Sequence, residues 1–248
     1  MRARAQLVAE SGPDGARLRW CCAAPIVVRQ TGPHRVHLVQ SAGGPLGGDE
    51  LALDIHLSVG ASLQVRSAAA TVVQSGSPLA PARWTVTADL ADGAMLDWCP
   101  EPTVVCDGAE LHSSMIVTLR RGARAALREV IVLGRAGQRG GCFRGEFTVE
   151  REGVPLLAHT LLLDGADPVL VGPAGTGGAR VVGMLAVVGE GIEGAPQDGG
   201  EQPGLRWAGS ALDGSGWLLL ALGDRVIDVI GVLNQTAQNV DEQPAELR

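Results

Sequence analysis

The feature that most constrains the fold is an alternation of apolar and polar residues with a period of two. Residues 51–57 read Leu-Ala-Leu-Asp-Ile-His-Leu, so that every second side chain is large and apolar. The pattern returns at residues 63–65, 84–90, 115–119 and 147–149. Because side chains of a β-strand point alternately to its two sides, each segment predicts a half-buried strand, and we expect a mainly β protein.

A short motif, L-x-x-G-A, stands between alternating segments at residues 57–61, 90–94 and 119–123. The glycine supplies the positive φ angle of a tight turn, the leucine closes one strand and the alanine opens the next. Each copy predicts a strand-turn-strand unit that must bury its apolar face on a neighbour. We therefore expect open, stacked, solenoid-like sheets built from repeated hairpins, although a Gly- and Ala-rich chain also produces this motif by chance.

The last third of the chain reads differently. An apolar, strand-like segment at 168–171 precedes a glycine-rich stretch, and the apolar run at 181–188 fits a strand or a short helix. Residues 189–204, rich in Gly, are expected to form an exposed loop.

Towards the C-terminus, Val226, Val229, Ile230 and Leu233 recur with helical spacing, and we expect one or two short helices in this part of the chain. Residues 235–248 are polar and are expected to be a frayed tail. One β domain of 248 residues is ordinary, so we assign residues 1–248 to a single domain.

Composition excludes several classes of partner and compartment. A net charge of −7 and a pI near 5.2 argue against binding to nucleic acid or to an anionic membrane. The N-terminus lacks the apolar core of a signal peptide, and the longest apolar run, residues 217–222, is too short to span a bilayer. The five cysteines form an odd set without paired spacing, which favours reduced thiols and a cytoplasmic location.

No catalytic motif is visible. Residues 172–179 have the glycine spacing of a phosphate loop, but Gly178 and Ala179 stand where such a loop needs Lys and Ser or Thr. His34 and His37 are three residues apart, which on a strand places them on opposite faces. The cysteines show no C-x-x-C pair, and neither a nucleophile elbow nor a zinc-binding helix appears. We therefore expect no enzyme activity.

The remaining candidates are carboxylates scattered through β sequence, most of which suit a solvated face or a turn. Asp49 is different because it follows Gly47 and Gly48 just before a strand. That position favours either a ligand contact or a side chain that fixes the turn.

Several segments, taken in order, resemble a known family. They are G-G-D at 47–49, A-T at 70–71, G-A-M-L-D-W at 93–98, P-E-P at 100–102, L-R-E at 127–129 and F-R-G at 143–145. No single motif is specific, but their order over residues 43–164 is similar to that of the urease accessory protein D family, UreD or UreH.

The resemblance implies an open, all-β maturation factor that is not an enzyme and holds no tight cofactor. Its implied partners are the urease apoprotein, an F-type accessory protein and, through it, a G-type GTPase that drives nickel transfer. Family members have polar interior residues viewed as a passage. The candidates carried over are Asp49, Glu50 and Glu101 for transient nickel, and Thr71, Glu129 and Arg135 for the lining. Carboxylates suit a divalent ion that must bind and leave.

Some positions depart from the family pattern. Residues 72–75 replace an aromatic-rich stretch, Gln138 replaces a frequent glutamate, and His159 with Thr160 replaces an acid-arginine pair. The residues alone also leave open a small-ligand-binding β protein without a maturation role, and a hydrolase that uses paired carboxylates.

Overall fold

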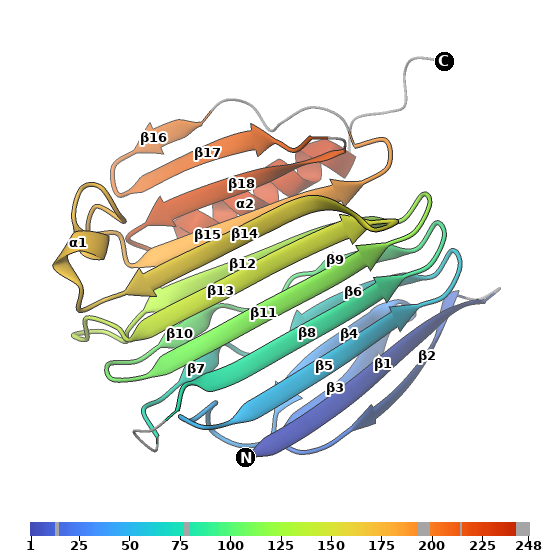
Figure 1. Cartoon of the computed structure of the whole chain (residues 1–248), viewed down its shortest axis with the longest axis horizontal. Coiled ribbons are helices and arrows are strands. Elements are labelled where there is room, and N and C mark those ends of the chain that lie inside the picture. Colours follow the sequence, from blue (N-terminus) through green and yellow to red (C-terminus); the bar gives the residue numbers. More distant parts are fainter. Residues whose placement is uncertain (13–14, 77–79, 193–198, 214, 242–248) are drawn as a thin grey trace.

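The computed structural model describes residues 1–12, 15–76, 80–192, 199–213 and 215–241. Two β-sheets lie face to face as two layers, with one helix against the second sheet (Figure 1). The seven strands of sheet A, in spatial order, are β14 (Val154–Asp164), β13 (Cys142–Arg151), β11 (Glu110–Leu119), β8 (Ala82–Leu90), β5 (Glu50–Leu57), β1 (Arg2–Gly12) and β2 (Gly15–Cys22).

Sheet B has eleven strands. Along its main path they are β16 (Gly200–Gln202), β17 (Leu205–Ala211), β18 (Gly216–Gly223), β15 (Val181–Gly189), β12 (Arg124–Leu133), β9 (Met95–Trp98), β6 (Ser62–Ser67), β4 (Arg35–Gln40) and β3 (Ile26–Gly32). Two short strands, β10 (Thr103–Val105) and β7 (Thr71–Val73), pair beside the lower part of β12.

The centre of the fold is a solenoid in which the chain alternates between the sheets. β5, β8, β11 and β13 are parallel in sheet A, and β6, β9 and β12 are parallel in sheet B. Each strand-turn-strand unit bridges the two layers, and its strands pair with the equivalent strands of the next unit. The mainly β, stacked and solenoid-like fold class expected from the repeat is thus confirmed.

The L-x-x-G-A turns stack on one another. Gly60, Gly93 and Gly122 have φ angles of 67° to 68°. The amide of Gly60 donates to the carbonyl of Asp92 over 2.9 Å, and that of Gly93 donates to Arg121 over 2.8 Å. Each turn therefore supports its neighbour as well as closing its own unit.

Replacing Gly93 with Ala is expected to lower the free energy of unfolding by about 1 kcal/mol, because a Cβ is strained at this φ angle. The nearest atom to the new Cβ is 4.0 Å away, so the loss measures backbone strain rather than a clash. Gly231→Ala is the matched control, since its Cβ meets nothing within 4 Å on a helix, where alanine stabilises by up to about 1 kcal/mol. Urea unfolding of both variants tests whether the free energy of unfolding falls in Gly93→Ala and rises in Gly231→Ala.

Antiparallel elements extend the solenoid at both ends. β2 and β14 close the edges of sheet A, and β15, β18 and β17 extend sheet B. The run at 181–188 is thus a strand, buried along its whole length. The second helix, α2 (Val226–Asp241), packs on β15 and β18 through Val229 and Leu233, which are fully buried.

The structure departs from three expectations for the C-terminal third. Residues 168–171 form a short helix, α1 (Pro168–Val171), because Asp167 accepts the amide of Val169 over 2.8 Å and Pro168 suits a first helical position. The expected loop at 189–204 contains β16, while its residues 193–198 lie outside the described chain. The expected frayed tail begins inside α2, which continues to Asp241; residues 242–248 are not described.

Candidate functional site

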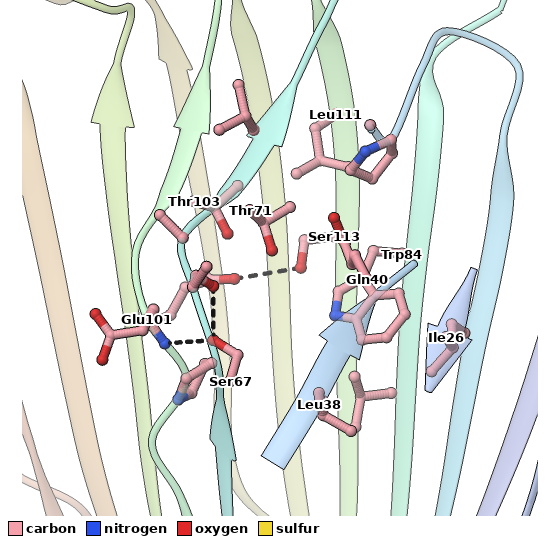
Figure 2. Close-up of a pocket in the computed structure, with 18 of the residues that line it drawn as sticks. Ile26, Leu38, Gln40, Ser67, Thr71, Trp84, Glu101, Thr103, Leu111 and Ser113 are labelled. Carbon is pink, nitrogen blue, oxygen red and sulfur yellow. Dashed lines mark hydrogen bonds between the residues drawn. The ribbon is translucent and has the colours of Figure 1, made fainter. Parts of the chain in front are cut away.

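A cavity of about 410 Å³ lies between the two sheets. It separates the apolar cluster near the L-x-x-G-A turns from a second cluster at the opposite ends of the strands. Sheet A contributes Trp84, Leu111, Ser113, Met115 and Phe147 to its lining. Figure 2 shows the side chains of Ser113, Thr71 and Trp84 converging on this space.

Interruptions in sheet B explain why the space is not filled. β6 ends at Ser67 and β7 begins at Thr71, while β9 ends at Trp98 and β10 begins at Thr103. The second gap lies beside β12 around Glu129, and the first gap lies beside the second at the same level. The three residues of the first gap are alanines at 68–70, whose small side chains leave the space open.

The mouth of the cavity lies at these interruptions. The lining residues exposed to solvent here are Gln40, Ala42, Gly43, Ala68, Ala69, Ala70 and Glu101. The rim is tied together by Ser67, whose hydroxyl accepts the amide of Glu101 over 2.8 Å and donates to the carbonyl of Ala69 over 3.1 Å. The cavity is therefore an interior chamber with a braced opening on the surface.

Glu129 supplies a half-buried carboxyl group inside this chamber. It lies on β12 with its side chain directed between the sheets, and the hydroxyl of Ser113 donates to Oε1 over 3.2 Å. Burial raises the pKa of Glu129 to about 7, and the hydrogen bond from Ser113 opposes this rise with a smaller effect. Near neutral pH the group therefore exchanges between a neutral acid and an anion that can bind a cation.

Four of the six residues expected from the resemblance line the cavity: Thr71, Glu101, Glu129 and Arg135. Thr71 is held by its amide, which donates to the carbonyl of Pro102 over 3.0 Å. Glu101 stands on the rim, and its carboxylate turns away from Thr71 and Ser113 (Figure 2). Arg135 is exposed at the far side of the lining, where its carbonyl accepts from Arg180 over 2.7 Å.

Asp49 and Glu50 do not line the cavity. Asp49 is 6% exposed, and its carboxylate accepts from the Met1 ammonium over 2.5 Å and from the amide of Leu46 over 2.9 Å. Burial opposes its ionisation, but these two donors outweigh burial and hold the pKa of Asp49 below its ordinary value. Glu50 is exposed and pairs with Arg2 over 2.8 Å. Both carboxylates thus have structural partners at the start of sheet A.

We expect Asp49→Ala to lower the free energy of unfolding at pH 7 by about 1 to 2 kcal/mol, since two charge-assisted hydrogen bonds are lost. Because folding lowers the pKa of Asp49, its stabilisation is present above the ordinary value of 3.8 and disappears as the pH falls through the folded value. Urea unfolding at pH 7 and near pH 3 tests this trend. Glu50→Ala is the control, as its exposed ion pair contributes little.

Ser113, Ser67 and Trp84 were missed by sequence reasoning. A signal for Ser113 was present, because it occupies an inward position of β11 between Leu111 and Met115, where the alternation calls for an apolar side chain. Glu129 breaks the inward pattern of β12 in the same way. Two polar residues at core positions of facing strands indicate a polar chamber.

The glycine-rich stretch after α1 is not available to an anion. The amides of Gly175 and Gly177 both donate to the carbonyl of Gly172 over 2.9 Å, and that of Gly178 donates to Val171 over 2.8 Å. A phosphate loop must instead point such amides at its ligand. The amides of this stretch are therefore used in backbone hydrogen bonds within the turn itself.

Within the described residues, no three His, Cys, Asp or Glu side chains gather closely enough to hold a metal ion. All five cysteines are free thiols. Among the helices that the structure describes, none has the length and apolar character needed to cross a bilayer.

Comparison with known proteins extends the likeness to almost the whole chain. The UreD urease accessory protein family matches residues 2–247. A urease accessory protein UreD of Frankia alni is 42% identical over 92% of this chain and 89% of its own length. A second UreD, from Frankia casuarinae, is 37% identical over 95% of this chain and 88% of its own. UreD of Streptomyces coelicolor is 41% identical over 69% and 70%, respectively. On this coverage, the chain belongs to the UreD urease accessory protein family and has a role in urease maturation.

Proposed function

We propose that this chain is a non-enzymatic cytoplasmic scaffold that passes nickel through its interior chamber to the urease apoprotein. The single observation that carries the proposal is the Glu129 carboxyl group, held inside a chamber that opens to solvent. Nickel is here the cargo, and the chain needs no resident cofactor for the task.

The chemistry of the chamber supports transit. A divalent ion that must arrive and leave is served by oxygen ligands, since a thiolate cage would retain it. Glu129, Ser113 and Thr71 offer a carboxylate and two hydroxyl groups on one interior path, and Glu101 adds a carboxylate near the mouth. Burial favours the neutral, protonated form of Glu129 over an unpaired anion. When nickel binds, it displaces the proton of this carboxyl group.

The proposed partners are the urease apoprotein and an F-type accessory protein, with a G-type GTPase joining through the latter. Deletion of the gene in its own host is expected to remove most urease activity and urease-bound nickel. The tagged full chain should copurify with the urease apoprotein and the F-type protein. Urease that remains active and nickel-loaded in the deletion strain would refute the proposal.

The volume of the chamber also suits a small organic ligand, because ligand pockets start at roughly 300 Å³. This second function predicts that a small-molecule panel raises the melting temperature of the chain. It further predicts that deletion of the gene leaves urease nickel content unchanged, which separates it from the maturation role.

A further inference from the structure

The outer face of sheet B is only partly covered. α2 packs on β15, β18 and β12, whereas β3, β4, β6 and β9 present their outward side chains to solvent. The residues of this open area, called the basic face below, are Arg29, Arg35, His37, Gln64, Arg66, Met95, Asp97 and Arg124. They form rows across the strands, since Arg29 on β3 lies opposite His37 on β4, and His37 lies opposite Arg66 on β6.

The basic face is positively charged, whereas the rest of the protein is negatively charged. It holds four arginines and one aspartate, a net charge of +3 with histidine neutral, so the remainder of a chain of net charge −7 carries −10. Asp97 is paired with Arg66. Within the described residues, Arg29, Arg35 and Arg124 have no carboxylate partner, and Arg35 donates instead to the amide oxygen of Gln64 over 2.8 Å.

Most arginines on the outer face of sheet A, in contrast, form ion pairs with carboxylates. There the ion pairs Arg2–Glu50, Arg4–Asp54, Arg19–Glu10 and Arg144–Glu146 neutralise charge within the sheet. Sheet A thus satisfies most of its cations internally. Three cations of the basic face are left for carboxylates from outside the chain.

The basic face also borders the mouth of the chamber. Arg66 is followed directly by Ser67, which braces the rim, and by the alanines at 68–70. On the next strand, Asp97 lies four residues before Glu101. A molecule seated on the basic face therefore lies beside the opening through which cargo would pass.

We propose that the basic face docks a carboxylate-rich surface of a protein partner in urease maturation, an inference that rests on the proposed function. A protein fits better than a nucleic acid because Met95 is 49% exposed, and because Val27 and Val39 are half-buried on the same face. Arg and Met are enriched in protein interfaces. A chain of net charge −7 also repels a polyphosphate.

The test measures binding of the purified full-length chain to the urease apoprotein and to the F-type protein of its own organism, at 50 and 300 mM NaCl. Arg29→Glu with Arg35→Glu is expected to weaken binding to one of them by about tenfold at the lower salt. Arg17→Glu with Arg83→Glu is the matched control, since these exposed arginines lie on the outer face of sheet A and change the net charge equally. The control pair should bind within about threefold of the unaltered chain, and salt should weaken the unaltered complex.

Equal losses in both variants would overturn the docking surface and assign the effect to net charge. Undiminished binding by the Arg29 and Arg35 variant would also overturn it. If the unaltered chain binds neither protein, the proposed function fails together with this surface. Binding to a short DNA duplex that is lost in the Arg29 and Arg35 variant would assign the face to a nucleic acid, and self-association lost in that variant would assign it to a second copy of this chain. Either result would refute docking of a partner in urease maturation.

Discussion

Glu129→Gln is expected to stabilise the folded chain at pH 8 while removing most of its ability to activate urease. In the unfolded chain this carboxyl group ionises near 4.5, whereas burial raises its pKa to about 7 in the fold. The folded state therefore holds the proton more tightly, and its stability falls as the pH rises from 4.5 through 7. The difference between these two pKa values lowers the free energy of unfolding at pH 8 by about 3 kcal/mol, as an upper value. A neutral amide at this position avoids that loss.

The pH dependence identifies the cause. Below pH 4.5 the glutamate is protonated in both states, so the two proteins should unfold at nearly the same urea concentration. Glu101→Gln serves as the control, because this exposed rim carboxylate should change stability by less than about 0.5 kcal/mol at either pH. A Glu129→Gln protein no more stable than the unaltered chain at pH 8 would contradict the burial of an ionisable group.

The functional half of the prediction is measured in the host strain. Loss of this interior carboxylate should lower urease activity and urease-bound nickel by at least about 10- to 100-fold, the range found when only a hydrogen-bonding partner of a metal ligand is removed. Glu129→Asp keeps the charge and should retain more activity than the amide. Full activation by Glu129→Gln would show that nickel does not depend on this group.

A gain in stability with a loss of function marks a residue kept for its chemistry. Glu129 and Ser113 both replace apolar side chains at inward positions of facing strands. Proteins commonly retain such costly groups where they act on a ligand.

The sequence predicted the repeating part of the fold because that part is governed by local rules. Strand alternation and the positive φ of Gly60, Gly93 and Gly122 are properties of short segments, and the repeat of L-x-x-G-A implies stacking. The pairing of each strand with the next unit, 29 to 33 residues away, also follows from this repeat. At residues 168–171 two local signals conflicted, because the apolar run favours a strand whereas Asp167 and Pro168 favour the start of a helix, and the helix formed.

The site was predictable only in part because its geometry depends on distant interruptions. The chamber exists where the breaks after Ser67 and after Trp98 fall at the same level of β12, and no local pattern shows that coincidence. Resemblance to the family supplied Thr71, Glu101, Glu129 and Arg135, which the structure brings to one cavity. It also supplied Asp49, whose contact with Leu46 fits the turn-fixing role that the local sequence allows, whereas its second partner, Met1, is 48 residues away and meets it only when sheet A is assembled.

The mouth of the chamber offers a second test with a large effect, since Ala70→Trp is expected to block nickel transfer without unfolding the chain. Ala70 is exposed, lines the chamber and lies between β6 and β7, so an indole ring there has room towards solvent and narrows the opening. Passage through a protein pore depends on its diameter, and we expect urease-bound nickel to fall by roughly tenfold or more. Stability should change by less than about 0.5 kcal/mol, as for other surface replacements.

Two variants make the Ala70→Trp result specific. Ala158→Trp places the same ring on the outer face of β14, at an exposed position outside the chamber lining, and should leave nickel transfer intact. Ala70→Ser adds one oxygen atom at the mouth and should remain active. If Ala70→Trp loads urease as well as Ala158→Trp does, the ion does not enter between β6 and β7, because a ring of this size cannot occupy the rim and leave the same passage open.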